Sequence, residues 1–216
     1  LGNVRETAAQ ILQMATEAAD DGAKLIVFPE LCLAGGYTSA DLFHQKKLRE
    51  EVEYYLGQIA TRSRSIDCVI VVGLPLCVNG NLFNVAAVID RGEIAGIVPK
   101  TYLPTGAEFQ EARWFGTADD LTVTMVELFD DTVPIGADLL FRSKNDPDVV
   151  LGVELCEDVW TPIPPSSFLA AAGATVLVNL SASNELVGKA QYRRDLITQQ
   201  SGRCLAGYIY SSAGPG

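Results

Sequence analysis

The sequence predicts an α/β fold with a mixed β-sheet, and three observations carry that prediction. Amphipathic segments with a helical repeat of apolar residues alternate with short, continuously apolar segments of strand length. Two pairs of strand-like segments are separated by turn signals, Asn79-Gly80-Asn81 and Arg91-Gly92, so part of the sheet is expected to be antiparallel. Of the 216 residues, 48% are hydrophobic, which suits one α/β unit with a substantial core.

The first half of the chain predicts two helices and four strands. Apolar side chains recur at helical spacing over residues 3–20, with Asn3 as a candidate N-cap, and again over residues 48–65. The strands are expected at residues 25–28, 68–76, 83–90 and 94–98. The first strand ends at Pro29-Glu30 and the fourth at Pro99-Lys100.

The second half begins with a long loop at residues 101–120, which is rich in aromatic and acidic residues. Loops of that length in compact domains are usually functional or disordered. Strands are then expected at residues 121–129, 138–142, 149–155, 174–180 and 205–211, and helices at residues 166–172 and 188–203.

Charge and cysteine content exclude several classes of function. The net charge is -11 and no cluster of Lys and Arg is present, so we expect neither nucleic acid nor a membrane as a partner. The five cysteines are odd in number, scattered and without a CxxC pair. This pattern argues against a disulfide framework and against a metal site, and it predicts a cytoplasmic protein.

The only histidine, His44, lies in a polar stretch that reads as a solvated helix start. Cysteine and serine hydrolases usually activate their nucleophile with a neighbouring imidazole. If Cys156 is a nucleophile, we therefore expect its base to be a carboxylate.

Three reactive side chains follow apolar segments of strand length: Glu30, Lys100 and Cys156. Strand ends in open α/β folds carry the chemistry, so the three are expected to converge on one pocket. Each also has a structural interpretation, because a free cysteine is commonly a small buried hydrophobe. Likewise, Glu30 can cap a helix and Lys100 can be solvated.

The strings VFPELCLAGGY, VPKTYLPTGAEFQEARWF, LCEDVWTPIPPS and NLSASN resemble the glutaminase domain of glutamine-dependent NAD+ synthetases, within the nitrilase (carbon–nitrogen hydrolase) superfamily. The resemblance implies a four-layer α-β-β-α sandwich. It also implies a strand before Leu1 and further strands after Gly216, so residues 1–216 are expected to be a partial glutaminase domain with both ends of the fold incomplete.

The same resemblance implies that Glu30 is the general base, Cys156 the nucleophile, and Lys100 the cation that stabilises the tetrahedral species. L-glutamine would be hydrolysed through a γ-glutamyl thioester, and the ammonia would serve an attached synthetase domain that makes NAD+ from deamido-NAD+. No cofactor is expected in this chain, and ATP and Mg are expected only in the synthetase domain. Superfamily members commonly form oligomers, so a homo-oligomer is expected.

The resemblance also implies contacts with glutamine. Ser183 and Lys189 match substrate-contacting positions, and a cation suits the α-carboxylate of the substrate. Their structural interpretations are a strand-end cap and a solvated helix residue. The remaining expected site residues are Glu157, Trp160 and Tyr37 in the pocket, with Glu108 orienting Lys100.

Two departures from the family pattern affect substrate binding. The family commonly reads LPxYxEFYE where this chain has LPTGAEFQE, so Gly106 stands at the position of a substrate-contacting tyrosine and Gln110 at the second tyrosine position. The doubled Gly35-Gly36 is expected to shift Tyr37 relative to Glu30. Two other functions remain open: a stand-alone amidase or carbamoylase, and a non-catalytic remnant or assembly module.

Overall fold

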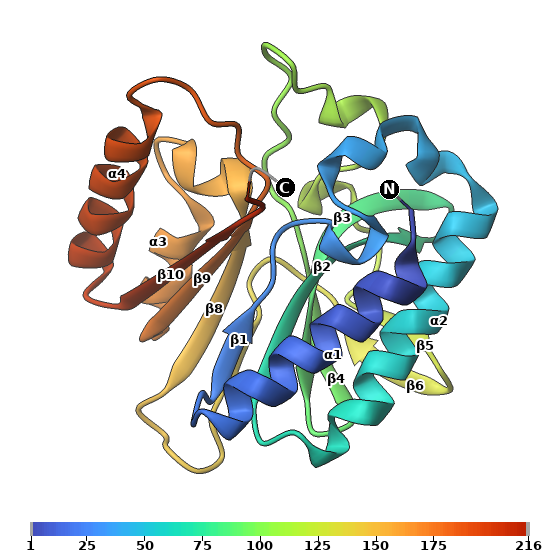
Figure 1. Ribbon diagram of the computed structural model, residues 1–216. Helices are drawn as coiled ribbons and strands as arrows, with labels where there is room; N and C mark the ends of the chain where they lie inside the picture. The colour runs from blue at the N-terminus through green and yellow to red at the C-terminus, as the bar shows by residue number, and fades with distance from the viewer. Residues whose placement is uncertain (1, 215–216) are drawn as a thin grey trace.

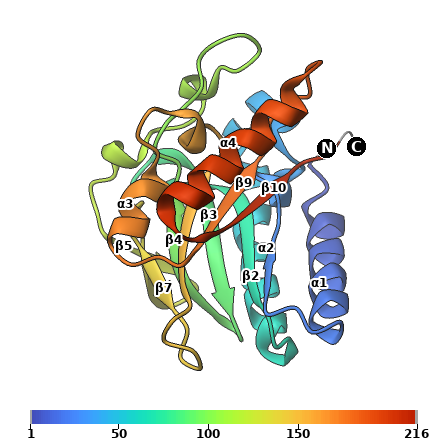
Figure 2. The ribbon, with the colours of Figure 1, turned by 90° about the vertical axis from the view of Figure 1, so that its left-hand side faces the viewer.

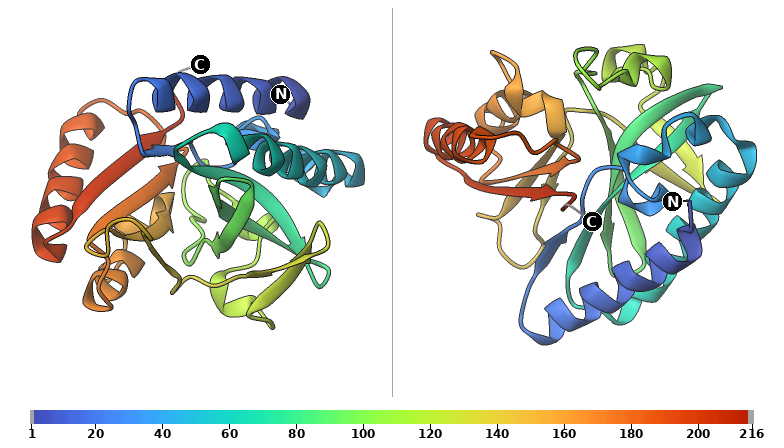
Figure 3. Two further views of the ribbon diagram at one scale, coloured as in Figure 1. Left: turned by 90° about the horizontal axis from the view of Figure 1, so that it is seen from below. Right: turned by 45° about the horizontal axis from the view of Figure 1, so that its top comes forward.

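The computed structural model describes residues 2–214. These residues form two four-stranded sheets, a two-stranded hairpin and four α-helices (Figure 1). The large sheets face each other, with α1 and α2 outside one and α3 and α4 outside the other, as the view from below shows (Figure 3). The predicted four-layer α-β-β-α sandwich is therefore confirmed.

The first sheet has β1 at one edge and β4 at the other. Its strands in spatial order are β1 (Leu25–Val27), β2 (Val69–Val78), β3 (Asn81–Asp90) and β4 (Glu93–Pro99). β1 is parallel to β2, and the two predicted hairpins make β2–β3 and β3–β4 antiparallel. β1 and β4 therefore point the same way. The outer face is covered by α1 (Val4–Asp20) and α2 (Lys46–Arg62), and Asn3 caps α1 by accepting a hydrogen bond from Glu6 N at 3.3 Å.

The second sheet is also mixed. Its strands in spatial order are β10 (Gly207–Ser212), β9 (Val176–Ser181), β8 (Val150–Leu155) and β7 (Leu140–Arg142). β8, β9 and β10 are parallel, and β7 is antiparallel to β8. The helices α3 (Pro165–Ala171) and α4 (Lys189–Cys204) lie over its outer face (Figure 2). Among residues 2–214, no helix is long and apolar enough to cross a membrane.

The segment expected to be a single strand at residues 121–129 forms part of a hairpin instead. β5 (Met125–Leu128) pairs with β6 (Asp131–Pro134), and β6 is not predicted from the sequence. The turn residues Phe129 and Asp130 have φ values of 54° and 67°. Hairpin turns with two positive φ angles favour Asn-Gly or Asp-Gly, so Phe-Asp gives no turn signal.

The strands sort their side chains into separate apolar layers. Along β2, Ile70, Val72 and Leu74 face the core under α1 and α2, whereas Val71 faces the other sheet. There it packs in a cluster with Val153 and other residues of β8 and β9. Burying an aliphatic side chain contributes about 1.5–3 kcal/mol, so this layer holds the two sheets together.

Candidate active site

A buried lysine lies at the centre of the candidate site. Lys100 directly follows β4, is 0% exposed, and places Nζ 2.6 Å from Glu30 Oε1 and 2.6 Å from Glu111 Oε1. Burial alone lowers the pKa of Lys100, but the charges of Glu30, Cys156 and Glu111 outweigh it and raise the pKa well above its usual value. The site therefore keeps a permanent ammonium.

Glu30, which follows β1, is held by three donors in a water-excluded position. Besides Lys100, Asn84 Nδ2 donates to Oε1 at 2.7 Å and the backbone N–H of Ala182 donates to Oε2 at 2.9 Å. The segment that carries Glu30 passes very close to β2 at Gly73. A Cβ at Gly73 would lie 2.5 Å from Leu31 N, so only glycine fits there.

Cys156 directly follows β8 and is 5% exposed. Its φ of 42° is uncommon for a residue with a side chain. Burial, reinforced by the charge of Glu30, raises the pKa of the thiol to about 12, although Lys100 and the Ala182 N–H oppose the rise. The resting thiol is therefore protonated, and a base is needed to activate it.

The structure brings Glu30, Lys100 and Cys156 together, although 126 positions separate the first from the last (156 minus 30). The N–H of Ala182, which binds Glu30 Oε2, also influences the Cys156 thiol. The charges of Glu30 and Lys100 also act on the Cys156 thiol, so a carboxylate, an ammonium and a sulfur lie near one another, as nucleophilic attack on an amide requires. Within residues 2–214, no group of three or more His, Cys, Asp or Glu side chains is arranged to hold a metal ion.

The structure corrects the residue expected to orient Lys100. Glu111, which is 0% exposed, contacts the ammonium, whereas Glu108 is exposed and accepts a hydrogen bond from Asn184 Nδ2. The backbone of Glu111 donates to Pro104 O at 3.1 Å and begins a 3-10 turn, Glu111–Arg113, that directs its side chain inward. The pKa of Glu111 is raised to about 7, mainly by burial, and Lys100 limits the rise.

Four of the residues expected to contact glutamine lie on the 3-10 segment after β8, on the loop after β9 and at the start of α4. Glu157 and Trp160 belong to the 3-10 segment Cys156–Trp160, and Ser183 follows β9. Lys189 is the first residue of α4; its Nζ lies 5.0 Å from the Trp160 ring centroid and donates to Asn184 Oδ1. The charge of Lys189 also reaches Glu157, whose pKa is raised chiefly by burial.

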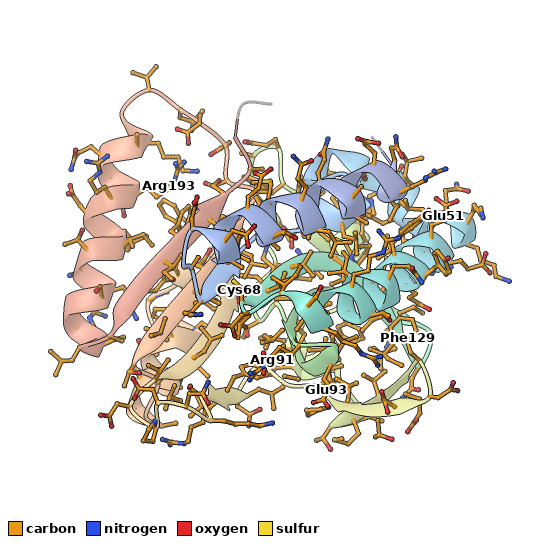
Figure 4. All side chains as sticks on the ribbon, turned by 60° about the horizontal axis from the view of Figure 1, so that its bottom comes forward. Glu51, Cys68, Arg91, Glu93, Phe129 and Arg193 are labelled. Carbon is orange, nitrogen blue, oxygen red and sulfur yellow. The ribbon has the colours of Figure 1, made fainter. Side chains whose placement is uncertain are left out.

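A side chain of α4 holds the loop that carries Ser183. Arg193, labelled in Figure 4, donates from Nη2 to the backbone oxygen of Asn184 at 3.0 Å. Its guanidinium carbon lies 5.7 Å from the ring centroid of Tyr210. Arg193 therefore connects the loop between β9 and α4 to α4 itself and, through Tyr210, to β10.

Tyr37 lies beside the carboxylates of the site despite the doubled glycine before it. Burial, with the charge of Glu111, raises the pKa of Tyr37, and Lys100 and Glu30 also influence it. Gly36 adopts φ 90° and ψ 179°, a conformation essentially restricted to glycine. At Gly106 an added Cβ would meet nothing within 4 Å, so the position of the missing tyrosine is open space.

Three further residues of the site, Asn84, Asn179 and Glu111, are not predicted from the sequence. Asn84 and Asn179 are both 0% exposed within strands whose neighbours are apolar. A polar residue inside such a strand is itself a signal, because buried amides need hydrogen-bond partners. Glu111 lies in a loop without periodicity, and the sequence offers no means to prefer it to Glu108.

A family model described as carbon-nitrogen hydrolase matches residues 2–213. The glutamine-dependent NAD(+) synthetase of Mycobacterium tuberculosis is 45% identical over 216 residues, covering 100% of this chain and 32% of that protein. The enzyme of that name from Thermotoga maritima is 31% identical over 202 residues, covering 93% and 31% respectively.

Solved structures agree with these matches. A glutamine-dependent NAD(+) synthetase from Cytophaga hutchinsonii superposes with a TM-score of 0.85 at 28% identity, covering 98% of this chain and 33% of that one. An amidase from Nesterenkonia sp. superposes with a TM-score of 0.73 at 19% identity, covering 98% and 71%, and thus shares the fold.

The chain spans about a third of the length of the curated relatives it matches (32% for the Mycobacterium tuberculosis protein). The match nevertheless runs along the whole of this chain, through the strand ends that carry Glu30, Lys100 and Cys156. The resemblance predicted from the sequence is confirmed. The chain belongs to the carbon-nitrogen hydrolase family.

Proposed function

We propose that this chain hydrolyses L-glutamine to glutamate and ammonia through a thioester on Cys156. The observation that carries the proposal is the buried Lys100 ammonium, bound between Glu30 and Glu111 at 2.6 Å from each. The charges of all three residues also act on the Cys156 thiol. The similarity to glutamine-dependent NAD+ synthetases supplies the substrate.

In the first half of the reaction, Glu30 accepts the thiol proton while Sγ attacks the carboxamide carbon of glutamine. A thiol with a pKa of about 12 gains most from such a base, which is typically worth about 10²–10⁴ in rate. The carbonyl oxygen becomes an oxyanion that faces the Lys100 ammonium and the backbone N–H of Glu157. Losing one donor of this kind typically costs about 3–4 kcal/mol.

In the second half, Glu30 returns its proton to the leaving nitrogen, so ammonia departs and a γ-glutamyl thioester remains on Cys156. Glu30 then takes a proton from water, whose oxygen attacks the thioester carbon. Collapse of the second tetrahedral species releases glutamate, and the proton on Glu30 restores the thiol. Lys100 keeps its charge throughout, because its pKa lies well above the usual value.

Recognition of glutamine rests on charge complementarity at the mouth of the site. The Lys189 ammonium suits the α-carboxylate, and the half-buried Glu157 suits the α-amino group. Ser183, which is 9% exposed, supplies a hydroxyl from the neighbouring loop, and Trp160 and Tyr37 supply apolar walls. We propose further that the ammonia serves a synthetase domain that uses ATP and Mg to make NAD+ from deamido-NAD+.

The proposal is tested by labelling the protein with a diazoketone analogue of glutamine, followed by peptide mass spectrometry. We expect the label on Cys156 alone among the five cysteines. Excess L-glutamine should protect Cys156, and Cys156→Ser should abolish labelling. Ammonia release is then compared between L-glutamine, N-carbamoyl amino acids and simple aliphatic amides.

Two outcomes would overturn the proposal. Faster turnover of an aliphatic amide or carbamoyl compound than of L-glutamine would indicate an amidase or carbamoylase instead. Absence of the label from Cys156 in the folded protein would indicate a site without catalytic function. Lys189→Ala is the matched specificity variant, because it should weaken binding of glutamine while leaving alkylation of Cys156 by a small neutral reagent unchanged.

A further inference from the structure

A buried carboxylate outside the proposed catalytic set joins the two sheets at the edge where the site lies. Asp158 is 1% exposed and accepts hydrogen bonds only from backbone N–H groups. Its Oδ1 accepts from Tyr102 N at 2.8 Å and Thr101 N at 3.1 Å, and its Oδ2 accepts from Leu155 N at 3.0 Å and, over a longer distance, from Thr101 N at 3.4 Å.

These donors flank the two residues that the proposed reaction needs on opposite sides of the substrate. Thr101 and Tyr102 directly follow Lys100 at the end of β4, in the first sheet. Leu155 directly precedes Cys156 at the end of β8, in the second sheet. Side chains in the layer between the sheets are apolar, and apolar contacts have no preferred direction, so they do not prevent one sheet from sliding over the other. A fixed distance between the Lys100 ammonium and the Cys156 sulfur therefore needs a directional contact.

We infer that Asp158 is a positioning residue that sets the distance between the Lys100 ammonium and the Cys156 sulfur by clasping the ends of β4 and β8. This inference rests on the proposed roles of Lys100 and Cys156. A displacement of about 1 Å between reacting groups can cost about 10²-fold in rate.

The clasp requires the ionised carboxylate, because each of its oxygens already faces an N–H group. Burial, with the charge of Glu154, raises the pKa of Asp158, while the N–H groups of Leu155 and Tyr102 oppose that rise. Asp158→Asn keeps the shape but has one acceptor oxygen. Its NH2 group must face either Leu155 N or Tyr102 N, so the variant loses the contact with β8 or the two shorter contacts with the residues after β4.

The first test measures carboxamidomethylation of Cys156 by iodoacetamide, with peptide mass spectrometry resolving all five cysteines. This reaction does not depend on glutamine, so it separates the clasp from the proposed substrate. We expect Asp158→Asn to slow labelling of Cys156 about 10-fold, because the thiol moves away from its base and its cation. Simple loss of stability would act in the opposite direction and speed labelling of the buried Cys156 and Cys68 and of the partly buried Cys32 alike.

Glu154→Gln is the matched control. Glu154 is also a carboxylate 1% exposed on β8, but it binds Ser166 N at 2.7 Å and Tyr208 OH, which both belong to the second sheet and its helices. We expect this variant to lower the melting temperature while leaving Cys156 labelling within twofold of the wild type. If Asp158→Asn labels Cys156 at the wild-type rate, the clasp has no positioning role.

A measurement on the wild-type protein tests the clasp even if the variants fail to fold. The amides of Thr101 and Tyr102 lie outside any strand, so without Asp158 they would exchange with deuterium as loop amides do. We expect both to be protected to the same degree as Leu155 N at the end of β8. Fast exchange of Thr101 and Tyr102 would overturn the inference. Where L-glutamine is hydrolysed, Asp158→Asn should lower kcat about 10- to 100-fold and change KM less than threefold.

Discussion

The side-chain amide of Asn179 is hydrogen bonded to both backbone groups of Cys156. Cys156 N donates to Asn179 Oδ1 at 3.1 Å, and Asn179 Nδ2 donates to Cys156 O at 3.4 Å. Asn179 therefore takes the place of a strand partner at the point where β8 has ended and Cys156 has a φ of 42°. A left-handed residue costs about 1–2 kcal/mol, and these contacts offset that cost.

Asn179→Leu should destabilise the protein and disable Cys156. Leucine has a similar size, but it leaves the N–H and C=O of Cys156 without partners, at about 1–3 kcal/mol for each buried group. Urea unfolding should show the loss of stability, and iodoacetamide labelling of Cys156 should differ from that of the wild type at least fivefold. Ser181→Ala is the control, because Ser181 Oγ donates to Asn179 Oδ1 at 2.7 Å, whereas both hydrogen bonds to the backbone of Cys156 come from Asn179 itself. Equal labelling in Asn179→Leu and the wild type would contradict the prediction.

Glu111→Gln should lower kcat for L-glutamine about 10- to 100-fold with little change in KM. Without the second carboxylate, Lys100 Nζ is drawn toward Glu30 and away from the oxyanion it is proposed to face. Steady-state ammonia release measures both constants. Glu108→Gln is the matched comparison, and its kcat should stay within threefold of the wild type, since Glu108 contacts Asn184 instead of Lys100. A lower kcat in Glu108→Gln than in Glu111→Gln would instead support Glu108 as the residue that orients Lys100.

The raised pKa of Glu111 predicts a pH-dependent stability. In the folded protein this pKa is about 7, against an ordinary value of 4.5, so the folded state holds the proton more tightly than the unfolded state does. Between the two values the stability therefore falls as pH rises. Relative to Glu111→Gln, the unfolding free energy of the wild type should drop by about 2 kcal/mol from about pH 5.5 to about pH 8. Urea titrations at the two pH values measure the difference, and a difference independent of pH would show that Glu111 does not titrate there.

The order of the elements could be predicted because apolar periodicity and turn chemistry act locally. Asn79-Gly80 and Arg91-Gly92 sit at the two turns of β2–β3–β4, as the sequence indicates. The hairpin of β5 and β6 could not be predicted, because Phe129 adopts a positive φ where a bulky residue is uncommon. The pairing of two sheets face to face depends on contacts between distant segments, and only the resemblance to a family predicted it.

Glu30 and Lys100 could be predicted to share one edge of a sheet, because each follows a strand of the first sheet and these two strands point the same way. Cys156 follows a strand of the second sheet, so its approach to them depends on the pairing of the two sheets. Their supporting residues are harder to find. Asn84 and Asn179 are the polar exceptions in apolar strands, and only the structure shows which strand end each of them holds. Asp158 reads in the sequence as one more acidic residue after Cys156, since nothing local reveals its donors at Thr101 and Tyr102.

Gly73→Ala should displace Glu30. The added Cβ would lie 2.5 Å from Leu31 N and 2.6 Å from Pro29 O, and both are backbone atoms that cannot rotate away. We expect a stability loss of about 1–3 kcal/mol and slower labelling of Cys156 by iodoacetamide. Gly152→Ala on β8 is the control, because its Cβ meets side-chain atoms of Leu169 and Leu177 at 3.1 Å, on the side away from the site. A comparable loss of labelling in both variants would indicate general destabilisation instead of a displaced base.

Gly106→Tyr should improve binding of glutamine. The family usually has a substrate-contacting tyrosine here, an added Cβ meets nothing within 4 Å, and the φ of Gly106 is not positive. The backbone can therefore accept a side chain without strain. One added hydrogen bond contributes about 0.5–1.5 kcal/mol, so KM for L-glutamine should fall about 2- to 10-fold with kcat unchanged. Gly106→Phe separates the ring from the hydroxyl, and Gly106→Ala tests the backbone alone. If the tyrosine and alanine variants have the same KM, the loop at residues 104–108 does not reach the substrate, and another side chain of the site takes over the role of the tyrosine.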